Sequence, residues 1–252
     1  MLDPIAQTVR IAAVGDLHYT RTSQGAALSV LSRVHEDADV LVLCGDLTDY
    51  GLAEEATLLS RDLQAAVRIP MVGVLGNHDY ESGQEVEVAR ILREGGVTLL
   101  DGDTTEIKGV GFAGIKGFCG GFGRGVLGAW GEATVKQFVN EAVAETMKLE
   151  SALARLRAPA KIAILHYAPV RDTVEGEPLE IYPYLGCSRL EEPLTRYPVT
   201  AVFHGHAHHG APEGRTSNGI PVYNVSLSLM REGRADRPYR VLEVETAMEV
   251  LQ

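Results

Sequence analysis

Residues 40–51 read VLVLCGDLTDYG. The apolar run Val40–Leu43 is typical of a strand buried on both faces, so Asp46 is expected just past the carboxyl end of a strand. Four more apolar runs lead directly into polar residues. These polar segments are Asp16-Leu17-His18, Gly76-Asn77-His78-Asp79, His166 and Gly205-His206-Ala207-His208. We interpret the five segments as parts of one site.

The spacing of the first three segments predicts how they come together. Asp46 follows Asp16 by 30 residues, and Asn77 follows Asp46 by 31. A βαβ unit takes about 30 residues, so these segments fit consecutive βαβ units of one parallel sheet. Ligands collect at the carboxyl ends of such strands. The sequence therefore predicts an α/β fold with one cleft that holds all three segments.

Hydrophobic periodicity extends this pattern along the chain. Strands are expected at 9–14, 40–43, 71–75, 97–100, 104–107, 110–115, 161–165, 199–203, 220–225 and 239–244. Helices are expected at 25–34, 52–67, 84–94, 134–156 and 190–196. The short runs within 97–115 indicate a second sheet. We expect a single domain, 1–252, with a loop and helix insertion at about 116–157 and a candidate lid at about 171–189.

Two of the expected helices have a marked apolar face. Leu28, Leu31 and Val34 share one face of the helix at 25–34. In the helix at 52–67, the acids Glu55 and Asp62 fall on the polar face. The seven glycines of 117–131 predict a loop, and the prolines and glycines of 171–186 predict an ordered excursion without a regular element.

Composition limits the classes of function. The chain has 252 residues, of which 45% are apolar and 23% charged, as in ordinary globular domains. Its formal net charge of -11 disfavours binding of long nucleic acid by phosphate neutralisation. No apolar run is long enough to cross a bilayer, so we expect no membrane partner.

The chain start and the cysteines predict a cytoplasmic protein. Met1–Ile5 contains an acid where a secretory signal has basic residues, and no apolar segment of signal length follows. Three cysteines are present, an odd number, and their wide spacing shows neither a disulfide framework nor a CxxC zinc pattern. Both features fit a reducing compartment.

The polar segments carry the side chains of a metal site. Their aspartate, asparagine and histidine residues, with no thiolate, suit manganese, iron, zinc, cobalt or nickel without distinguishing between them. Asp16 and His18 lie two residues apart, so in an extended segment both would face one ion, and His206 and His208 repeat that spacing. Asp46 is the central candidate to bridge two ions about 3.5–4 Å apart.

Each segment alone also has an ordinary structural explanation. Gly-Asp-x-x-Asp is commonly a helix-capping turn, because aspartate accepts bonds from first-turn amides. Asn77-His78-Asp79 fits a simple turn, and a single histidine such as His166 is commonly a core residue. The joint pattern favours the metal site, because seven of the eight histidines, all except His35, lie in segments that follow apolar runs.

The order of the five motifs resembles the calcineurin-like metallophosphoesterase superfamily, and the likeness spans residues 16–208. The resemblance implies a four-layer αββα sandwich of the α/β (α+β) class, in which two mixed β-sheets are flanked by helices. It also implies two divalent or trivalent metal ions at the strand ends. The expected α/β start and the later short strands agree with this architecture.

The resemblance also implies roles for individual residues. One metal would be held by Asp16, His18, Asp46 and His208. The second would be held by Asp46, Asn77, His166 and His206. His78 would be the catalytic histidine that binds no metal, Asp49 the carboxylate that orients it, and Asp79 a weaker supporting candidate.

The implied reaction is hydrolysis of a phosphoester by a hydroxide held between the metals. We expect a small soluble phosphodiester as substrate, with a cyclic nucleotide as one candidate. The alternatives are a phosphomonoesterase, including a phosphoprotein phosphatase, and a non-catalytic metal-binding scaffold. Candidate substrate contacts, each with packing or solvent exposure as the alternative, are Arg124, Arg171, Arg189, Tyr19, Tyr80 and Tyr167. The oligomeric state is left open.

Overall fold

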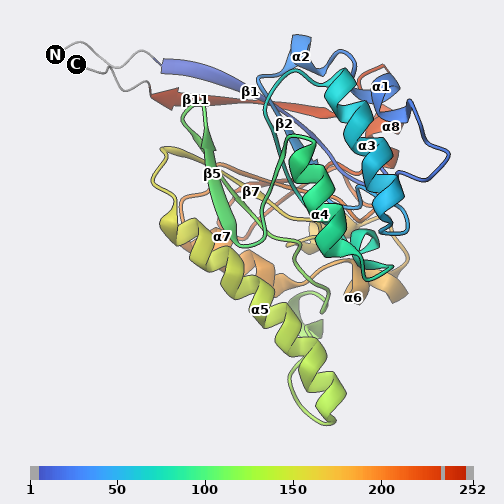
Figure 1. Ribbon diagram of the computed structural model, residues 1–252. Coiled ribbons are helices and arrows are strands. Elements are labelled where there is room, and N and C mark those ends of the chain that lie inside the picture. Colours follow the sequence, from blue (N-terminus) through green and yellow to red (C-terminus); the bar gives the residue numbers. More distant parts are fainter. Residues whose placement is uncertain (1–5, 234–235, 248–252) are drawn as a thin grey trace.

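Two stacked β-sheets form the centre of the molecule (Figure 1). The computed structural model describes residues 6–233 and 236–247, so Met1–Ile5 lies outside the described residues. The first sheet has the order β11 (Arg240–Ala247), β1 (Ala6–Val14), β2 (Val40–Cys44), β3 (Met71–Val74), β4 (Val97–Leu99). The second has the order β5 (Asp103–Ile107), β6 (Val110–Gly114), β7 (Ala160–Ile164), β8 (Ala201–His204), β10 (Pro221–Asn224), β9 (Glu213–Arg215). Both sheets are mixed.

Helices cover the outer face of each sheet. Over the first sheet lie α1 (Ala26–Leu31), α2 (Val34–Asp37), α3 (Ala53–Ala66) and α4 (Glu85–Glu94). Over the second lie α5 (Ala133–Arg155) and α7 (Glu191–Arg196), and one end of α5 projects from the body (Figure 1). The remaining helices are α6 (Tyr182–Leu185) and α8 (Leu227–Gly233). The predicted four-layer sandwich is therefore confirmed.

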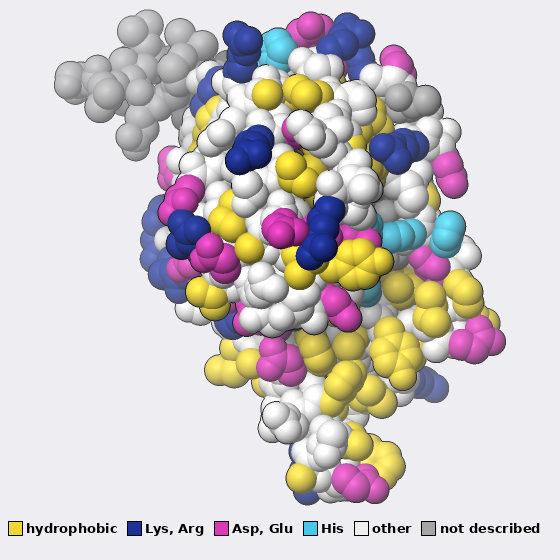
Figure 2. Space-filling view, turned by 45° about the vertical axis from the view of Figure 1, so that its right-hand side comes forward, with side chains coloured by type: hydrophobic (Ala, Val, Ile, Leu, Met, Phe, Trp, Pro, Cys, Tyr) yellow, Lys and Arg dark blue, Asp and Glu magenta, His cyan; other side chains and the backbone are white. Residues whose placement is uncertain are grey.

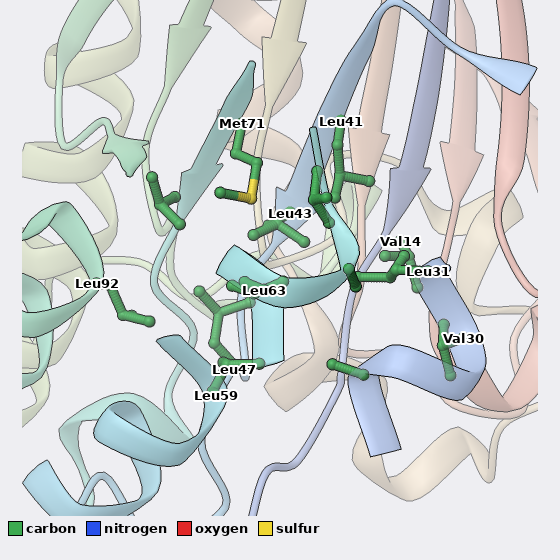
Figure 3. Packing of buried hydrophobic residues seen from close by; sticks show 14 of the residues in the cluster. Val14, Val30, Leu31, Leu41, Leu43, Leu47, Leu59, Leu63, Met71 and Leu92 are labelled. Atoms are coloured by element: carbon green, nitrogen blue, oxygen red, sulfur yellow. The ribbon is translucent and has the colours of Figure 1, made fainter. Parts of the chain in front are cut away.

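Strand alternation explains why the two sheets stack. In β2, Leu41 and Leu43 point to the helix layer, where they pack with Leu59 and Leu63 of α3 (Figure 3). Val42, the residue between them, points to the layer between the sheets. Because successive side chains of a strand face opposite sides, an unbroken apolar run buries both faces.

The strands β1, β2 and β3 are parallel neighbours, as the motif spacing predicted. The expected second sheet begins later than predicted, however, because β4 pairs with β3 and only β5 and β6 belong to the second sheet. The strand β9 and the helix α8 were not predicted. The loop at 117–131 is irregular except for a 3₁₀ turn at Gly123–Gly125, and 171–186 contains only single helical turns.

Two helix predictions need correction. The expected helix at 25–34 is broken between α1 and α2, so that Leu31 and Val34 are buried while Leu28 remains 37% exposed. In α3, Glu55 and Asp62 are buried rather than solvent-facing. Glu55 accepts bonds from the backbone at the start of its own helix, and Asp62 accepts the Tyr19 hydroxyl. Buried carboxylates require such partners.

Within the described ranges, no helix combines the length and the apolar character needed to cross a membrane.

Candidate metal centre

The ends of five strands meet at one edge of the sandwich. Asp16 and Asp46 each lie two residues beyond a strand of the first sheet, and Asn77 follows β3. His166 and His206 lie two residues beyond β7 and β8 of the second sheet. The sequence predicted that these side chains share a cleft, and the structure brings them together in three contiguous groups. The groups are Asp16, His18, His208; His18, Asp46, His78; and Asp46, His166, His206, each with its ligand atoms within 4.8 Å of one another.

The backbone of these loops is not extended. Asp16, His18, Asp46 and His206 all have positive φ, at 57°, 44°, 47° and 71°. The expectation of an extended Asp16–His18 segment is therefore wrong, although both side chains do lie in one group with His208. Non-glycine residues in this region cost of order 1–3 kcal/mol each and persist where the surroundings enforce them.

Backbone pairing between the loops enforces this conformation. The amide of Asp16 donates to the Gly45 carbonyl at 2.9 Å, and the amide of His18 donates to the Asp46 carbonyl at 3.0 Å. The amide of His206 donates to the Asp16 carboxylate at 3.0 Å. The β1 and β2 loops thus continue their pairing past the strand ends, and the β8 loop is tied to them.

Glycines beside the ligands allow this close approach. A Cβ at Gly45 would lie 2.5 Å from Nδ1 of His166, and a Cβ at Gly205 would lie 2.5 Å from Oδ2 of Asp16. A Cβ at Gly76 would collide with the Asp46 carboxylate and amide. Each of these three positions therefore requires glycine, because any side chain there would collide with a neighbouring candidate ligand.

The first group joins the two sheets. Nε2 of His208 lies 3.3 Å from Oδ1 of Asp16 and 3.3 Å from Nε2 of His18. Burial would raise the pKa of Asp16, but the bond from His208 and the charge of His166 together lower it, and the same bond raises the pKa of His208. Two imidazole nitrogens face one another here beside a carboxylate, an arrangement that fits a bound cation in place of the His208 proton.

The third group surrounds His166, which is fully buried. Nδ1 of His166 lies 2.9 Å from the Cys44 carbonyl and donates to it, so Nε2 faces Asn77 Oδ1 at 2.9 Å and Asp46 Oδ1 at 3.3 Å. Burial alone would lower the pKa of His166, but Asp46 outweighs burial and raises it to about 9. In the metal-free fold, Nε2 of His166 therefore carries a proton that points to Asn77 Oδ1 and Asp46 Oδ1. A metal ion bound by these three atoms would take the place of that proton.

His206 completes this group. Its Nε2 lies 3.1 Å from the Tyr184 carbonyl, and since a carbonyl oxygen only accepts, Nε2 donates and Nδ1 keeps its lone pair. Its ring lies 4.8 Å from the His166 ring. Burial and His166 lower the pKa of His206 to about 4, so this imidazole is neutral and available as a ligand.

Asp46 is shared by the second and third groups and so connects the first group to the third. Its Oδ1 is 3.3 Å from Nε2 of His166 and accepts the His78 amide at 2.8 Å, while its Oδ2 is 3.9 Å from Nε2 of His18. Burial would raise the pKa of Asp46, but His166 holds it well below the usual range. A permanently ionised carboxylate with one oxygen toward each group is suited to bridge two cations.

His78 and Asp49 are arranged differently from the prediction. The carboxylate of Asp49 bonds His18, with Oδ1 3.0 Å from Nδ1, and lies 3.7 Å from Nδ1 of His78. His78 instead donates Nδ1–H to the backbone carbonyl of Asp49 at 2.7 Å. The side chain of His78 is 41% exposed. Within the described residues its Nε2 makes no hydrogen bond, and it lies beside the candidate ligands His18 and Asp46.

Asp79 has a larger structural role than the sequence suggested. It is fully buried and accepts bonds from the amides of Leu47, Thr48 and Gly76 and from the Thr48 hydroxyl, at 2.6–3.2 Å. Burial and the nearby Asp46 raise its pKa. Asp79 therefore locks the β2 loop to the β3 loop, and the only signal in the sequence was an acid directly after His78.

The glycine-rich loop at 117–131 and the candidate lid at 171–189 lie side by side next to His206. Gly120 donates its amide to Pro183 at 2.8 Å, and Gly121 donates to Gly186 at 2.9 Å. The segment at 171–189 is held to β8 through Thr173, whose hydroxyl bonds the buried His204 at 2.8 Å. His204 has its pKa lowered to about 4 by burial and serves as a neutral support.

Among the candidate substrate contacts, two arginines have structural partners. Arg189 donates to the Leu127 carbonyl at 3.0 Å, and Arg171 stacks on Tyr182. Tyr167 packs against His206, with ring centroids 4.5 Å apart. Tyr19 is buried on Asp62. Figure 2 shows histidine side chains at the surface with hydrophobic side chains gathered below them, so the centre opens to solvent.

Comparison with known proteins gives one family and several similar folds. The family model described as calcineurin-like phosphoesterase matches residues 9–210. Comparison with curated proteins gives no match. Among solved structures, the phosphopantetheinyl hydrolase from Mycobacterium tuberculosis is similar over 92% of this chain and 95% of its own, with 16% identity and a TM-score of 0.65.

Two further structures share the fold at low identity. A protein of Thermus thermophilus is 17% identical over 94% of this chain and 99% of its own, with a TM-score of 0.54. A protein described as a putative 5′-nucleotidase from Staphylococcus aureus is 13% identical over 96% of this chain but only 51% of its own, with a TM-score of 0.53.

Proposed function

The chain belongs to the calcineurin-like phosphoesterase family, and from this premise we propose that it hydrolyses a small soluble phosphodiester at a dinuclear metal centre. The observation that carries the proposal is the position of Asp46, whose two oxygens face separate groups of imidazoles. We assign one metal to Asp16, His18 and His208, with Asp46 reaching it through the oxygen that faces His18. The other is assigned to Asp46, Asn77, His166 and His206.

The donor set fits hard to borderline cations, because it contains only imidazole nitrogen and carboxylate or amide oxygen. When bound, two such ions supply a nucleophile near neutral pH and neutralise the phosphate oxygens. The residues of the chain hold the ligand atoms in place beforehand: Cys44 and Tyr184 fix the tautomers of His166 and His206 through their carbonyls. Such partners raise the basicity of a ligand and fix its direction.

His78 is proposed as the general acid. The Asp49 carbonyl fixes Nδ1–H, so Nε2 is the nitrogen that would hand a proton to the departing oxygen. The side chain is 41% exposed, which allows it to regain the proton from solvent after each turnover. A positioned imidazole is a common general acid for a departing oxygen.

Charge supports the diester over the monoester. In the described part of the chain, the carboxylates of the centre pair only with histidines within 4.0 Å, and neither lysine nor arginine joins them. A monoester brings two negative charges to the metals and a diester brings one, so this centre offers less compensation for a monoester. The net charge of -11 also disfavours long nucleic acid as substrate.

The fold neighbours include proteins named for two kinds of phosphoester, a phosphopantetheinyl hydrolase and a 5′-nucleotidase. The test therefore measures hydrolysis of bis(p-nitrophenyl) phosphate and p-nitrophenyl phosphate with added manganese, before and after chelation. A cyclic-nucleotide panel, a phosphopantetheinyl ester and a phosphopeptide follow. Faster cleavage of the diester, lost on chelation, is the expected result.

Two other outcomes would change the proposal. Cleavage of the monoester alone would establish a phosphomonoesterase, and the phosphopeptide would then test action on phosphoproteins. No turnover of any ester by protein that carries two metals would favour a metal-binding scaffold. Asp46→Asn is the matched inactive control, because it removes one charge from the centre.

A further inference from the structure

Lys116 lies at the same edge of the sandwich as the metal centre. It follows β6 by two residues, and its carbonyl accepts the amides of His166 at 3.0 Å and Tyr167 at 3.2 Å. The backbone of Lys116 is therefore fixed to the strand end that carries His166. Sequence reasoning did not select this residue, because a single lysine after a strand carries no motif.

The ammonium of Lys116 sits among three aromatic rings. Nζ is 5.0 Å from the ring centroid of Phe118, 5.4 Å from that of Tyr167 and 5.5 Å from that of Tyr80. The Tyr167 ring is also 4.5 Å from the His206 ring, and Tyr80 follows His78 by two residues. One ring thus separates this cation from a proposed metal ligand.

The ammonium has unused hydrogen-bonding capacity. Nζ donates one bond, to the Gly117 carbonyl at 2.9 Å, and an ammonium has three donors. Two acids on this side of the molecule share one cation: Lys148 bonds Glu145 at 2.7 Å and Asp101 at 2.9 Å. Within residues 6–233 and 236–247, Lys116 has no ion-pair partner at 4.0 Å or less. A partly desolvated cation without a partner gains from an anionic ligand.

A pocket of about 210 Å³ extends from Lys116 and Tyr80 along the strand ends. Its apolar walls are Leu75, beyond β3, and Leu99 and Leu100, at the end of β4. The charged side chains on its walls are Lys116, Arg93, Glu85 and Asp101. Asp101 is bonded to Lys148, and in the described part of the chain Lys116 forms no ion pair with any of these side chains.

We propose that Lys116 is a specificity-determining residue that binds a second anionic group of the substrate, while the pocket beside it takes an apolar part of the same molecule. This inference rests on the proposed function and narrows it. The substrate class is a phosphoester whose organic part carries a carboxylate or a further phosphate. The aromatic rings around Nζ hold the ammonium in position and exclude water from the contact.

The test measures binding rather than turnover, by calorimetry with the manganese-loaded protein. The probes are phenylphosphonate, 4-carboxyphenylphosphonate and 1,4-phenylenediphosphonate, whose carbon–phosphorus bonds the protein does not hydrolyse. The second anion is expected to tighten binding about tenfold or more in wild type. Comparison of 4-carboxyphenylphosphonate with 1,4-phenylenediphosphonate then shows whether a carboxylate or a second phosphonate binds more tightly.

Three variants isolate the charge of Lys116. Lys116→Met keeps an apolar stem among the rings and is expected to abolish the tightening, while leaving phenylphosphonate affinity unchanged. Lys116→Arg is expected to restore it. Lys136→Met, on the exposed start of α5, removes the same charge elsewhere and is expected to behave as wild type.

The inference is overturned if the second anion tightens binding equally in Lys116→Met, or if it tightens nothing in wild type. Binding of none of the three probes by wild type also overturns it. Ester hydrolysis, measured separately, decides whether the proposed function fails too. Wild type that cleaves phosphodiesters but ignores the second anion retains the function and loses only the role of Lys116.

Discussion

The carboxylate of Asp49 bonds the imidazole of His18, with Oδ1 3.0 Å from Nδ1. The imidazole of His78 is held instead by the backbone carbonyl of Asp49, at 2.7 Å. One residue thus orients a proposed metal ligand with its side chain and the proposed general acid with its backbone. The two functions can be separated by substitution, because only the side chain changes.

Replacing Asp49 by Asn should weaken metal binding more than it disturbs His78. Loss of a carboxylate partner of a ligand histidine typically costs about 10- to 100-fold in metal affinity. Metal affinity measured by competition with a fluorescent chelator should fall in that range, and the rate at saturating metal should stay near wild type. Glu54→Gln on the surface of α3 is the control. A rate that stays low at saturating metal would return Asp49 to the role of orienting His78.

Replacing His78 by Ala should leave two metals bound and lower the rate by about 10² to 10⁴. The loss should be larger for an alkyl ester than for a p-nitrophenyl ester, because a good leaving group needs less help from an acid. Metal content by mass spectrometry and rates on both esters check this. Equal losses on the two esters would exclude His78 as the general acid.

Replacing Asp46 by Asn should remove the stability that metals confer. At a free concentration 100 times Kd, a ligand stabilises the folded state by about 2.7 kcal/mol, which corresponds to about 5–10 °C in Tm for a chain of this size. Thermal unfolding with manganese and with chelator should show this difference in wild type and in Asp39→Asn, but not in Asp46→Asn. A full metal-dependent shift in the Asp46 variant would refute its bridging position.

Replacing Gly76 by Ala should disrupt the centre through one methyl group. The added Cβ would collide with the carboxylate and the amide of Asp46, whereas a Cβ at Gly125 meets no atom within 4 Å. Overpacking of this kind costs about 1–3 kcal/mol, and open surface changes stay within about 0.5 kcal/mol. Urea unfolding and metal content compare Gly76→Ala with Gly125→Ala. Equal stability and metal content in the two variants would contradict the packing described for the β3 loop.

Metal affinity should rise with pH because of His166. Burial would lower the pKa of this imidazole, but Asp46 raises it from 6.5 to about 9 in the metal-free fold. The proton on His166 therefore stabilises the metal-free protein fully below pH 6.5, and this contribution is lost as the pH rises through about 9. Since a metal must displace that proton, affinity should increase about tenfold per pH unit between about 6.5 and 9.

Chelator competition at about pH 6.5, 7.5, 8.5 and 9.5 measures this slope. His166→Gln should flatten it, because an amide carries no proton to displace. His204, which is buried with its pKa lowered to about 4, is neutral throughout this range and should not contribute. An unchanged slope in the His166 variant would assign the proton to another group.

Strand periodicity and motif spacing were sufficient to predict three neighbouring parallel strands, whereas the four-layer sandwich was predicted only by the resemblance to the family. The apolar runs before Asp16, Asp46 and Asn77 form the parallel neighbours β1, β2 and β3, because such runs can only be buried on both faces of a sheet. The same runs predicted that the polar residues after them share one edge. Sequence thus determined the fold class and the identity of the side chains that converge.

Only the tertiary structure decided how those side chains are used. The positive φ of Asp16 and Asp46 follows from pairing between loops that lie 30 residues apart, and local sequence carries no signal for it. The partner of Asp49, the lock formed by Asp79 and the place of Lys116 among three rings depend on contacts between segments far apart in the chain. Periodicity reports which face of an element is buried, whereas orientation within a site is set by long-range packing that no single segment encodes.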